Sequence, residues 1–310
     1  MTKQIKTAYI KLHIAVFLFG FTAILGKLIT LNQTALVWNR LWISCAGLLF
    51  VPGIFKGFKS ISKSNLIVFS SIGLLIALHW ITFYGSIKLG DNVSVTLACL
   101  ATTPLFTSVF EPLLFRRKLL ITEIVLGIVT IVGVYLITGV GKFYYPAIIS
   151  GIISAAFASL FTVFNKKYLA ENNAYSVSFI EFFAGWILIS LIILMTSNFN
   201  FSQLFPDKQS LSNSWNFVFL NIHSDWYYLL VLGLLCTCLA FVFNLQALKH
   251  LSAFTSNLSV NLEPVYGIIM GAVFFNENQS LNLMFYLGAG IILGCVLLHP
   301  LLRRNNANQF

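Results

Sequence analysis

The chain has 310 residues, of which 58% are hydrophobic and only 9% are charged, and its mean hydropathy is +0.87. This number of charged side chains is too small to cover the surface of a water-soluble domain. The composition therefore predicts a membrane protein. In a soluble protein, the net charge of +10 would point to nucleic acid or anionic lipid. Here the basic residues lie in short connections, where they set the orientation in the bilayer, and we expect no nucleic-acid partner.

A transmembrane helix needs about 20 mainly apolar residues. Ten such runs follow one another along the chain: 9–30, 34–54, 65–87, 92–115, 121–140, 146–165, 175–197, 226–248, 252–275 and 281–299. Eight of the nine connections are short. The long one, 198–225, is expected to be an external loop with some structure of its own. The sequence therefore predicts an all-α polytopic membrane protein with ten transmembrane helices.

Alternate connections differ in basic charge, which accumulates on the cytoplasmic side of membrane proteins. One set of connections, together with both termini, carries fourteen Lys and Arg residues, and the other carries only Lys88, Lys142 and Lys208. Two more, Lys27 and Arg40, lie within the predicted spans. We therefore expect a multi-pass protein of the inner (cytoplasmic) membrane with both termini in the cytoplasm.

The two halves of the chain are similar to each other. Placing Pro104 over Pro264 also brings Phe115 over Phe275. With five spans in each unit, the second copy enters the membrane from the opposite side, so residues 1–142 and 143–310 are predicted to be inverted five-helix repeats. Inverted repeats with a site near the bilayer midplane where they meet are typical of secondary transporters.

Several motifs in a fixed order carry a resemblance to a known family. They are Phe19-Gly20 to Lys27, Arg40, Trp80 to Lys88, Ser154 to Lys167, Leu262-Glu263-Pro264-Val265, Glu277, and the glycines Gly288, Gly290 and Gly294 of the last span. In these motifs the chain resembles the EamA domain of the drug/metabolite transporter superfamily over nearly its whole length. The resemblance implies two inverted helical bundles that move small solutes by alternating access. The chain departs from the family at Arg116-Arg117-Lys118, where members often carry a glutamate.

Glu263 is the strongest candidate for a solute-binding or coupling residue. It lies about twelve residues from either end of its apolar segment, and an acid at that depth costs about 2.5 kcal/mol or more on insertion scales. Desolvation there favours the neutral acid, which would suit a proton-coupling site. The alternative is a structural acid that bonds asparagine or backbone groups freed by the Pro264 kink.

Two other acids lie within apolar runs. Glu111 shares a helical stripe with Thr103, but it is one turn from Arg116 and Arg117, so the favoured interpretation is pairing with these cations near the cytoplasmic surface. Glu181, about six residues into the seventh span, is a weaker candidate.

Buried cations favour an anionic or zwitterionic solute. Arg40 lies about six residues inside the external end of the second span. Its guanidinium can clamp a carboxylate or phosphate, and snorkelling or pairing with an acid are the alternatives. Lys27 can also snorkel to the external end. His79, beside Trp80 in the third span, is either a neutral histidine bonded to a carbonyl or a proton relay.

Polar uncharged residues add further candidates. Asn257 and Asn261 lie beside the stripe of Glu263, and together with the threonines of the fourth span they favour a shared cavity. Hydrogen bonding between packed helices is the alternative, and we favour it for Thr103. Asn244 and Asn165 are candidate contacts to the solute.

Enzyme signatures such as G-x-S-x-G, H-E-x-x-H and the Walker nucleotide loop are absent from the sequence. We therefore predict that the protein is not an enzyme and has no catalytic residue, metal site or cofactor. The expected function is secondary transport of a small polar metabolite, an amino acid or related compound, with export as the expected direction. The expected partners are this small-molecule substrate, protons and membrane lipid. Gly267 with Gly271, and Gly290 with Gly294, indicate close helix packing or a homodimer.

Three alternatives stay open. A nucleotide-sugar or drug-type carrier would have the same fold, since the superfamily that the chain resembles handles such solutes. A membrane-embedded enzyme acting on lipid would need acids or histidines clustered at one interface, whereas those of this chain are scattered in depth. A scaffold or sensor would need no polar stripe facing a cavity.

Overall fold

The computed structural model describes residues 2–90, 93–138, 145–195, 201–206, 225–266, 269 and 283–307. Every regular element in these residues is a helix. Several predicted features lie outside them: Lys142, Lys208, Gly267, Gly271, Phe275, Glu277 and most of the 198–225 connection.

The first half of the chain forms seven of the described helices. They are α1 (Lys3–Leu28), α2 (Gln33–Leu49), α3 (Ile54–Ser60), α4 (Lys63–Gly90), α5 (Val93–Leu100), α6 (Thr103–Phe115) and α7 (Ile121–Thr138). The second half forms α8 (Tyr145–Tyr168), α9 (Ala174–Met195), the 3₁₀ helix η1 (Phe201–Leu204), α10 (Asp225–Leu230), the π-helix η3 (Val231–Leu239), α11 (Ala240–Leu248), α12 (Ala253–Val260) and α14 (Leu283–Ala307).

Six of the described helices are long and apolar enough to cross a membrane: Lys3–Leu28, Lys63–Gly90, Val95–Phe115, Tyr145–Tyr168, Ala174–Met195 and Asp225–Leu248. The pair α2 and α3 makes a seventh if its two helices form one span, and Ile121–Leu136 and Leu283–His299 are shorter apolar helices. The chain is therefore a multi-pass membrane protein. Its count of ten spans stays a prediction, because the ninth predicted span, 252–275, is described only in part.

The second predicted span, 34–54, ends earlier than its hydrophobicity suggested. Helix α2 stops at Leu49, and α3 leaves it at an angle of 98°. Pro52 and Gly53 separate the two helices, and Gly53 has a φ of 84°, which favours glycine. Helix α3 is exposed at Phe55 and Lys56, so it belongs to the end of the bundle rather than to its core.

Two helices break at corresponding places. A turn at residues 101–102 precedes Pro104 between α5 and α6, and a turn at 261–262 precedes Pro264 after α12. Proline has no N–H and clashes with the preceding turn of a helix, so carbonyl groups are released at such breaks. The released carbonyl oxygen of Ala101 accepts a hydrogen bond from Asn261 Nδ2 at 3.4 Å. The two breaks therefore contact each other inside the bundle.

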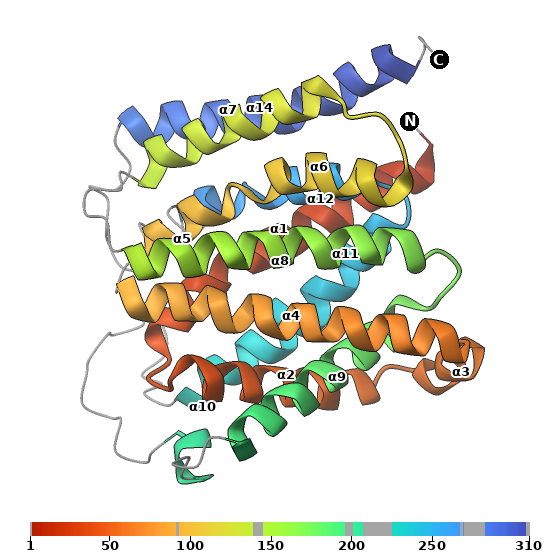
Figure 1. The fold of residues 1–310 in the computed structure, drawn as a ribbon, viewed down its shortest axis with the longest axis vertical. Helices are drawn as coiled ribbons and strands as arrows, with labels where there is room; N and C mark the ends of the chain where they lie inside the picture. The colour runs from red at the N-terminus through yellow and green to blue at the C-terminus, as the bar shows by residue number, and fades with distance from the viewer. Residues whose placement is uncertain are drawn as a thin grey trace.

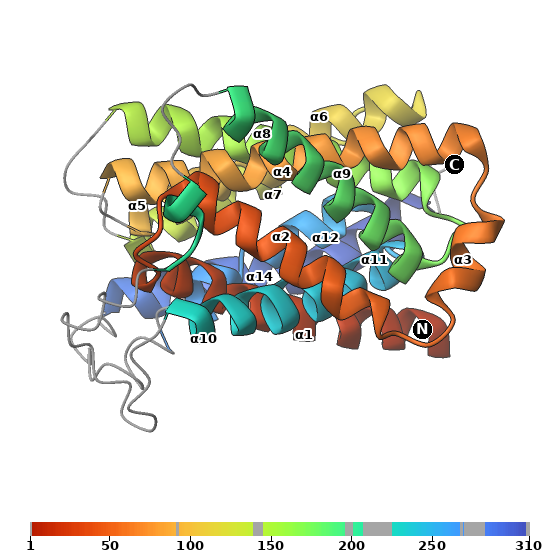
Figure 2. The ribbon, with the colours of Figure 1, turned by 90° about the horizontal axis from the view of Figure 1, so that it is seen from below.

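The long helices lie side by side in one bundle, with α7 and α14 packed together along one edge (Figure 1). Helix α4 packs against α8 and α9, α1 packs against α11 and η3, and α2 packs against α9 and η3. Figure 1 shows α2, α9 and α10 on the opposite side of the bundle from α7 and α14, and Figure 2 shows this side from below. The N-terminal end of α1 and the C-terminal end of α14 lie at the same end of the bundle.

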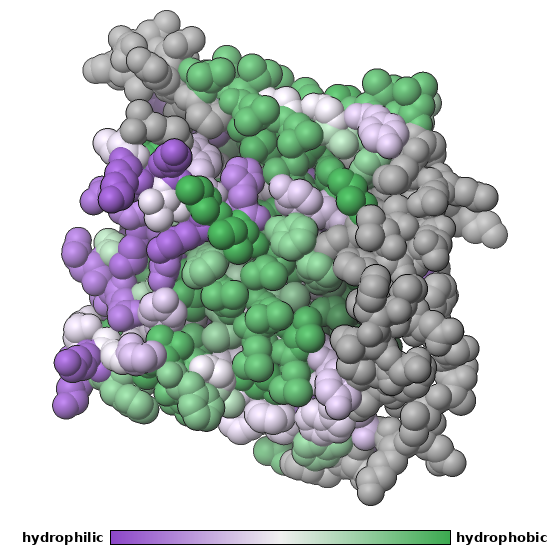
Figure 3. Space-filling model, turned by 180° about the vertical axis from the view of Figure 1, so that it is seen from behind, coloured by the Kyte–Doolittle hydropathy of each residue, from purple (hydrophilic) through white to green (hydrophobic). Residues whose placement is uncertain are grey.

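The surface carries an apolar belt and a hydrophilic end (Figure 3). On α7, Ile121, Val125, Ile128 and Val132 follow one another at helical spacing and are exposed, which is the pattern of a face turned toward lipid. Hydrophilic residues gather at the end that holds α3 and the start of α1. The surface is thus divided as a bilayer requires.

Candidate functional site

Arg40 is completely enclosed by the bundle, with 2% of its surface exposed. Its Nε donates to Thr237 Oγ1 at 2.6 Å and its Nη1 donates to Tyr84 Oη at 2.8 Å. The guanidinium carbon lies 3.9 Å from the ring centroid of Trp80, a cation–π contact. In the described part of the chain, no acid lies within ion-pair distance of Arg40. The cation is therefore rigidly positioned by neutral groups, and it does not snorkel to the surface.

The π-helix η3 places the threonine that holds Arg40. Thr237 Oγ1 donates to the carbonyl of Leu232, five residues earlier, at 2.6 Å. Ser44, one turn after Arg40 on α2, donates to the carbonyl of Gly233 at 2.8 Å. Gly233 has no side chain, so α2 can approach η3 closely. The π-helix η3 spans nine residues, Val231–Leu239, so it is longer than the single-turn π-bulges that are frequent at functional sites.

Glu263 lies just after the break in α12 and is 6% exposed. Its Oε1 accepts a hydrogen bond from Thr22 Oγ1 of α1 at 3.1 Å. In the ranges that the structure describes, the Arg40 guanidinium and the Glu263 carboxyl form neither an ion pair nor a hydrogen bond with each other. Among the described residues, neither Nη2 of Arg40 nor Oε2 of Glu263 has a hydrogen-bond partner. The buried cation and the buried acid thus each have one side-chain atom that is available to bind a ligand.

The polar stripes of α6 and α12 face each other and bond directly. Asn257 Nδ2 donates to Thr107 Oγ1 at 2.7 Å, and Thr107 also bonds Ser159 Oγ at 2.8 Å. Ser256 Oγ donates to Asn244 Oδ1 at 2.7 Å. These contacts join α6, α8, α11 and α12, so they are the hydrogen bonds between helices that transmembrane packing uses. Asn257 and Asn244 are engaged by protein groups in this conformation.

Several predicted site residues lie away from Arg40 and Glu263 or are otherwise engaged. Thr103 is buried at the start of α6, where its carbonyl accepts from Thr107. His79 Nδ1 lies 2.8 Å from Ser154 Oγ and 2.9 Å from the Ser154 carbonyl. Lys27 is exposed at the end of α1.

Glu111 belongs to a charged network at the hydrophilic end. Its Oε2 accepts from the backbone N–H of Phe254 at 2.9 Å, at the start of α12, and lies 3.3 Å from Arg117 Nη2. Arg117 also pairs with the buried Glu123 of α7 at 3.5 Å, and Glu123 lies 3.7 Å from His299 Nε2 of α14. Sequence reasoning missed Glu123 and His299, since they come together only through the packing of α7 on α14. Carboxylates stabilise helix N-termini, and these contacts are those of an acid that pairs with a neighbouring cation, the interpretation favoured from the sequence.

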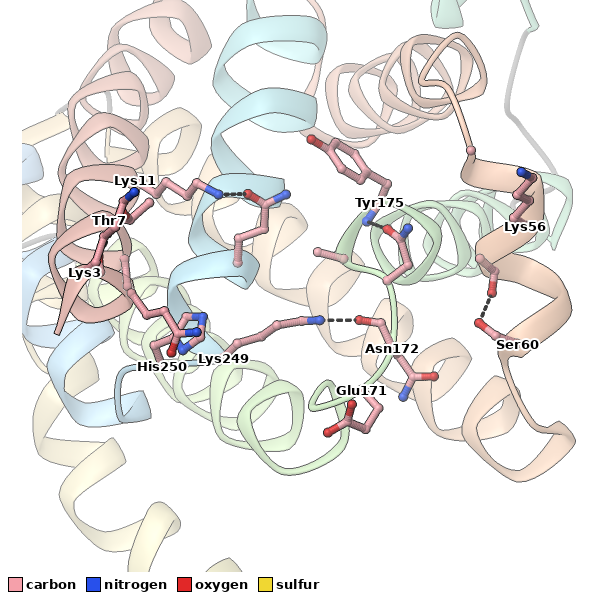
Figure 4. A pocket seen from close by; sticks show the side chains of 17 residues that line it. Lys3, Thr7, Lys11, Lys56, Ser60, Glu171, Asn172, Tyr175, Lys249 and His250 are labelled. Carbon is pink, nitrogen blue, oxygen red and sulfur yellow. Dashed lines mark hydrogen bonds between the residues drawn. The ribbon is translucent and has the colours of Figure 1, made fainter.

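A vestibule of about 1100 Å³ opens at the hydrophilic end of the bundle (Figure 4). Four lysines line it, Lys3, Lys11, Lys56 and Lys249, together with a single acid, Glu171. Lys11 Nζ donates to Gln246 Oε1 at 2.6 Å, and Lys249 Nζ donates to the Asn172 carbonyl at 2.6 Å. Burial lowers the pKa of Lys249, and the negative charge of Glu171 partly opposes this. Lysines therefore outnumber acids in the lining of the vestibule. In the sequence analysis, the basic residues had predicted only the orientation of the chain in the membrane.

The chain is similar in sequence to a family of known transporters. The model of the EamA-like transporter family matches residues 6–139 and again residues 145–299. An uncharacterized transporter of Bacillus subtilis (strain 168), YxxF, is 22% identical over 300 residues, which cover 94% of this chain and 88% of that protein. An uncharacterized transporter of Clostridium kluyveri is 22% identical over 214 residues, 66% of this chain and 63% of that protein.

A solved crystal structure shares the fold, with a TM-score of 0.71 and 16% sequence identity over 97% of this chain and 98% of that one. The family model covers most of the chain in two consecutive matches. The resemblance predicted from the sequence motifs is confirmed, and the chain belongs to the EamA-like transporter family.

Proposed function

We propose that the protein is a secondary transporter that moves a small zwitterionic metabolite, an amino acid or related compound, outward across the cytoplasmic membrane by alternating access. The solute lies between Arg40 and Glu263. The observation that carries this proposal is the pair of buried, opposite charges, each with one atom left unbonded by the described residues. Arg40 would bind the solute carboxylate and Glu263 its ammonium group.

Pseudo-symmetric packing supports two inverted repeats, 1–142 and 143–310, with five spans each. The contact of α4 with α8 has its counterpart in α11 with α1, and the contact of α4 with α9 has its counterpart in η3 with α2. Gly73 and Gly233 are separated by 160 residues, as are Pro104 and Pro264 at the two helix breaks. Under this arrangement the α7–α14 pair stands at the periphery while the other spans enclose the site.

The hydrophilic end is proposed to face the cytoplasm, with both termini, because basic connections stay on that side. The four lysines of the vestibule would then raise the local concentration of anionic and zwitterionic solutes before export. The same charges would favour a nucleotide-sugar carrier as the second candidate, since phosphate is bound by the same basic groups. No enzymatic step is part of either proposal.

A thermal-shift screen tests the solute class. Purified protein in detergent is heated with each amino acid, and every hit is repeated with its decarboxylated and its deaminated analogue. We expect both analogues to lose the stabilisation, since each leaves one buried charge without a partner. That loss is on the order of 2 kcal/mol or more, roughly 30-fold in Kd. Binding that needs neither charged group, or that is confined to nucleotide sugars, would refute the zwitterion.

Glu263 is also proposed to exchange protons during transport. Once a solute is identified, proteoliposome flux of Glu263→Gln is compared with wild type, with and without a pH gradient. Glutamine keeps the shape of the side chain and cannot release a proton, so the gradient should no longer accelerate flux. Gradient dependence equal to that of wild type would eliminate Glu263 as a proton carrier. Lys59→Gln, on the exposed face of α3, is the matched surface control.

A further inference from the structure

A second group of buried polar side chains comes from α8 and α9, which both pack against α4. Glu181, Asn165 and Ser178 each have no exposed surface. Both oxygens of Glu181, both amide atoms of Asn165 and the hydroxyl of Ser178 lack a hydrogen-bond partner among the described residues. Ser178 and Glu181 are three residues apart and share a face of α9. Asn165 of α8 lies near the Glu181 carboxyl, although no hydrogen bond joins the two side chains in this conformation.

Burying these polar side chains costs free energy of folding unless they have hydrogen-bond or ion partners. An unpaired buried amide or hydroxyl costs about 1–3 kcal/mol, and an unpaired buried carboxylate costs far more. Native proteins therefore satisfy nearly all buried polar groups with protein, water or an ion. The oxygens of Glu181, Asn165 and Ser178 that have no hydrogen-bond partner among the described residues are therefore available to bind an ion.

The charges on neighbouring helices are engaged elsewhere. Arg40 of α2 bonds Tyr84 and Thr237, and His79 of α4 bonds Ser154. Three lysines donate to main-chain carbonyls: Lys166 and Lys167 at the end of α8, and Lys249 after α11. On α3, Lys56 and Lys59 are exposed at the end of the bundle. None of these groups forms an ion pair with Glu181 in the described part of the chain.

Glu181 also occupies a special position in the helix. It is the eighth residue of α9, as Arg40 is the eighth residue of α2. A Cβ at Gly73 of α4 would overlap the carbonyl oxygen of Glu181, and Gly233 of η3 lies against the carbonyl oxygen of Arg40. The two repeats thus carry opposite charges at matching places. Glu181 lies where α9 packs most closely against α4, so its state of charge bears on whether these helices stay together.

We propose that Glu181, Asn165 and Ser178 form a further ion site, separate from Glu263, which binds one monovalent cation, either H⁺ or Na⁺. The Glu181 carboxylate neutralises the ion, and the side-chain oxygens of Asn165 and Ser178 complete the site. Oxygen donors suit a hard cation. Without the ion, the charged carboxylate must be hydrated, which requires α9 to separate from α4. With the ion bound, the helices can close. This inference rests on the proposed transport function, because a coupling ion has meaning only in a transporter.

Ion binding is measured on the full chain in detergent, without any solute, so its failure is distinct from failure of the solute site. In the first arm, thermal unfolding is followed in NaCl and in choline chloride at equal ionic strength, above neutral pH. In the second arm, a hydrophobic carbodiimide, which reacts with buried protonated carboxyl groups, labels the protein from acidic to alkaline pH. Mass spectrometry of peptides then locates the label.

Each arm identifies one ion. Stabilisation by Na⁺ over choline, together with protection of Glu181 from the carbodiimide by Na⁺, identifies sodium. Labelling of Glu181 that falls as the pH rises and is unaffected by Na⁺ identifies a proton. Glu181→Gln should abolish the effect in both cases. Glu171→Gln, on the exposed loop between α8 and α9, should leave it unchanged.

Asn165→Ala is a second variant, which keeps the Glu181 carboxylate. It tests the proposal even if Glu181→Gln does not fold. Loss of one donor should weaken Na⁺ binding ~10-fold or more, or shift the pH midpoint of labelling. The proposal fails if wild type shows neither Na⁺ stabilisation nor labelling of Glu181 at any pH. It also fails if folded Glu181→Gln responds to Na⁺ as wild type does. Either of these two outcomes is expected if the three side chains bind only structural water.

Discussion

At the scale of single residues, the fixed position of Arg40 depends on two hydroxyl groups. Tyr84→Phe removes one of them and keeps the ring. We expect the thermal stability to fall, since an unpaired buried donor costs about 1–3 kcal/mol. Solute affinity should also fall, because the guanidinium loses its fixed orientation. Calorimetry and ligand titration measure the two effects. Tyr175→Phe, at the vestibule wall, is the control, and equal behaviour of the two variants would contradict this role of Tyr84.

Burial depth allowed the sequence to single out Arg40 and Glu263, because charged residues in apolar runs are rare and costly. The partners could not be predicted in the same way. Tyr84 and Thr237 bond Arg40 from helices that are distant in the chain. Thr237 also lies in a π-helix, and no residue pattern in the sequence predicts that geometry. The predicted pairing of Glu111 with Arg117 is confirmed, since the two residues are only six positions apart in the chain and α6 ends between them.

At the scale of elements, the crossing of α4 and α9 depends on glycine. A Cβ at Gly73 would overlap the backbone of Glu181, so Gly73→Ala must push the two helices apart, at a cost of about 1–3 kcal/mol. Gly290 on α14 is the matched control, because a Cβ there meets no described atom within 4 Å. Gly290→Ala should be neutral or raise stability by up to about 1 kcal/mol through helix propensity. Thermal melts of the two variants that coincide would contradict this account of the crossing.

The elements differ from their sequence prediction where local geometry competes with hydrophobicity. The apolar run 34–54 was predicted as one span, yet α2 ends at Leu49 because Pro52 and Gly53 cannot continue it. Gly290 and Gly294 were predicted to serve close packing or a dimer, and a Cβ at either meets no described part of this chain within 4 Å. A dimer contact through them stays a prediction. The shared spacing of glycines tells how closely a helix can be approached, but not by which partner.

At the scale of the whole molecule, the hydrophobic pattern predicted long apolar helices in a multi-pass protein, and the structure and family confirm this coarse result. The period and length of apolar runs are local properties, so one sequence suffices to predict them. Which helices cross at Arg40 and Glu181 is decided by packing between the halves. The sequence contained that information only as matching glycines and prolines, whose meaning became visible once α4 lay against α9 and η3 against α2.

Topology is tested by cysteine accessibility in a background whose five native cysteines, four buried and one half-buried, are replaced. Asn32→Cys lies between α1 and α2, whereas Ser60→Cys and Asn173→Cys lie at the hydrophilic end, and all three positions are exposed. A membrane-impermeant maleimide should label only Asn32→Cys on intact cells, and the other two only in inverted vesicles. If Ser60 and Asn173 lie on the same side of the membrane, the chain between them crosses it an even number of times. The helices in this part of the chain are α4, the pair α5 and α6, α7, and α8. Labelling of these two positions on opposite faces would rule out the ten-span arrangement, and labelling of both from outside would reverse its orientation.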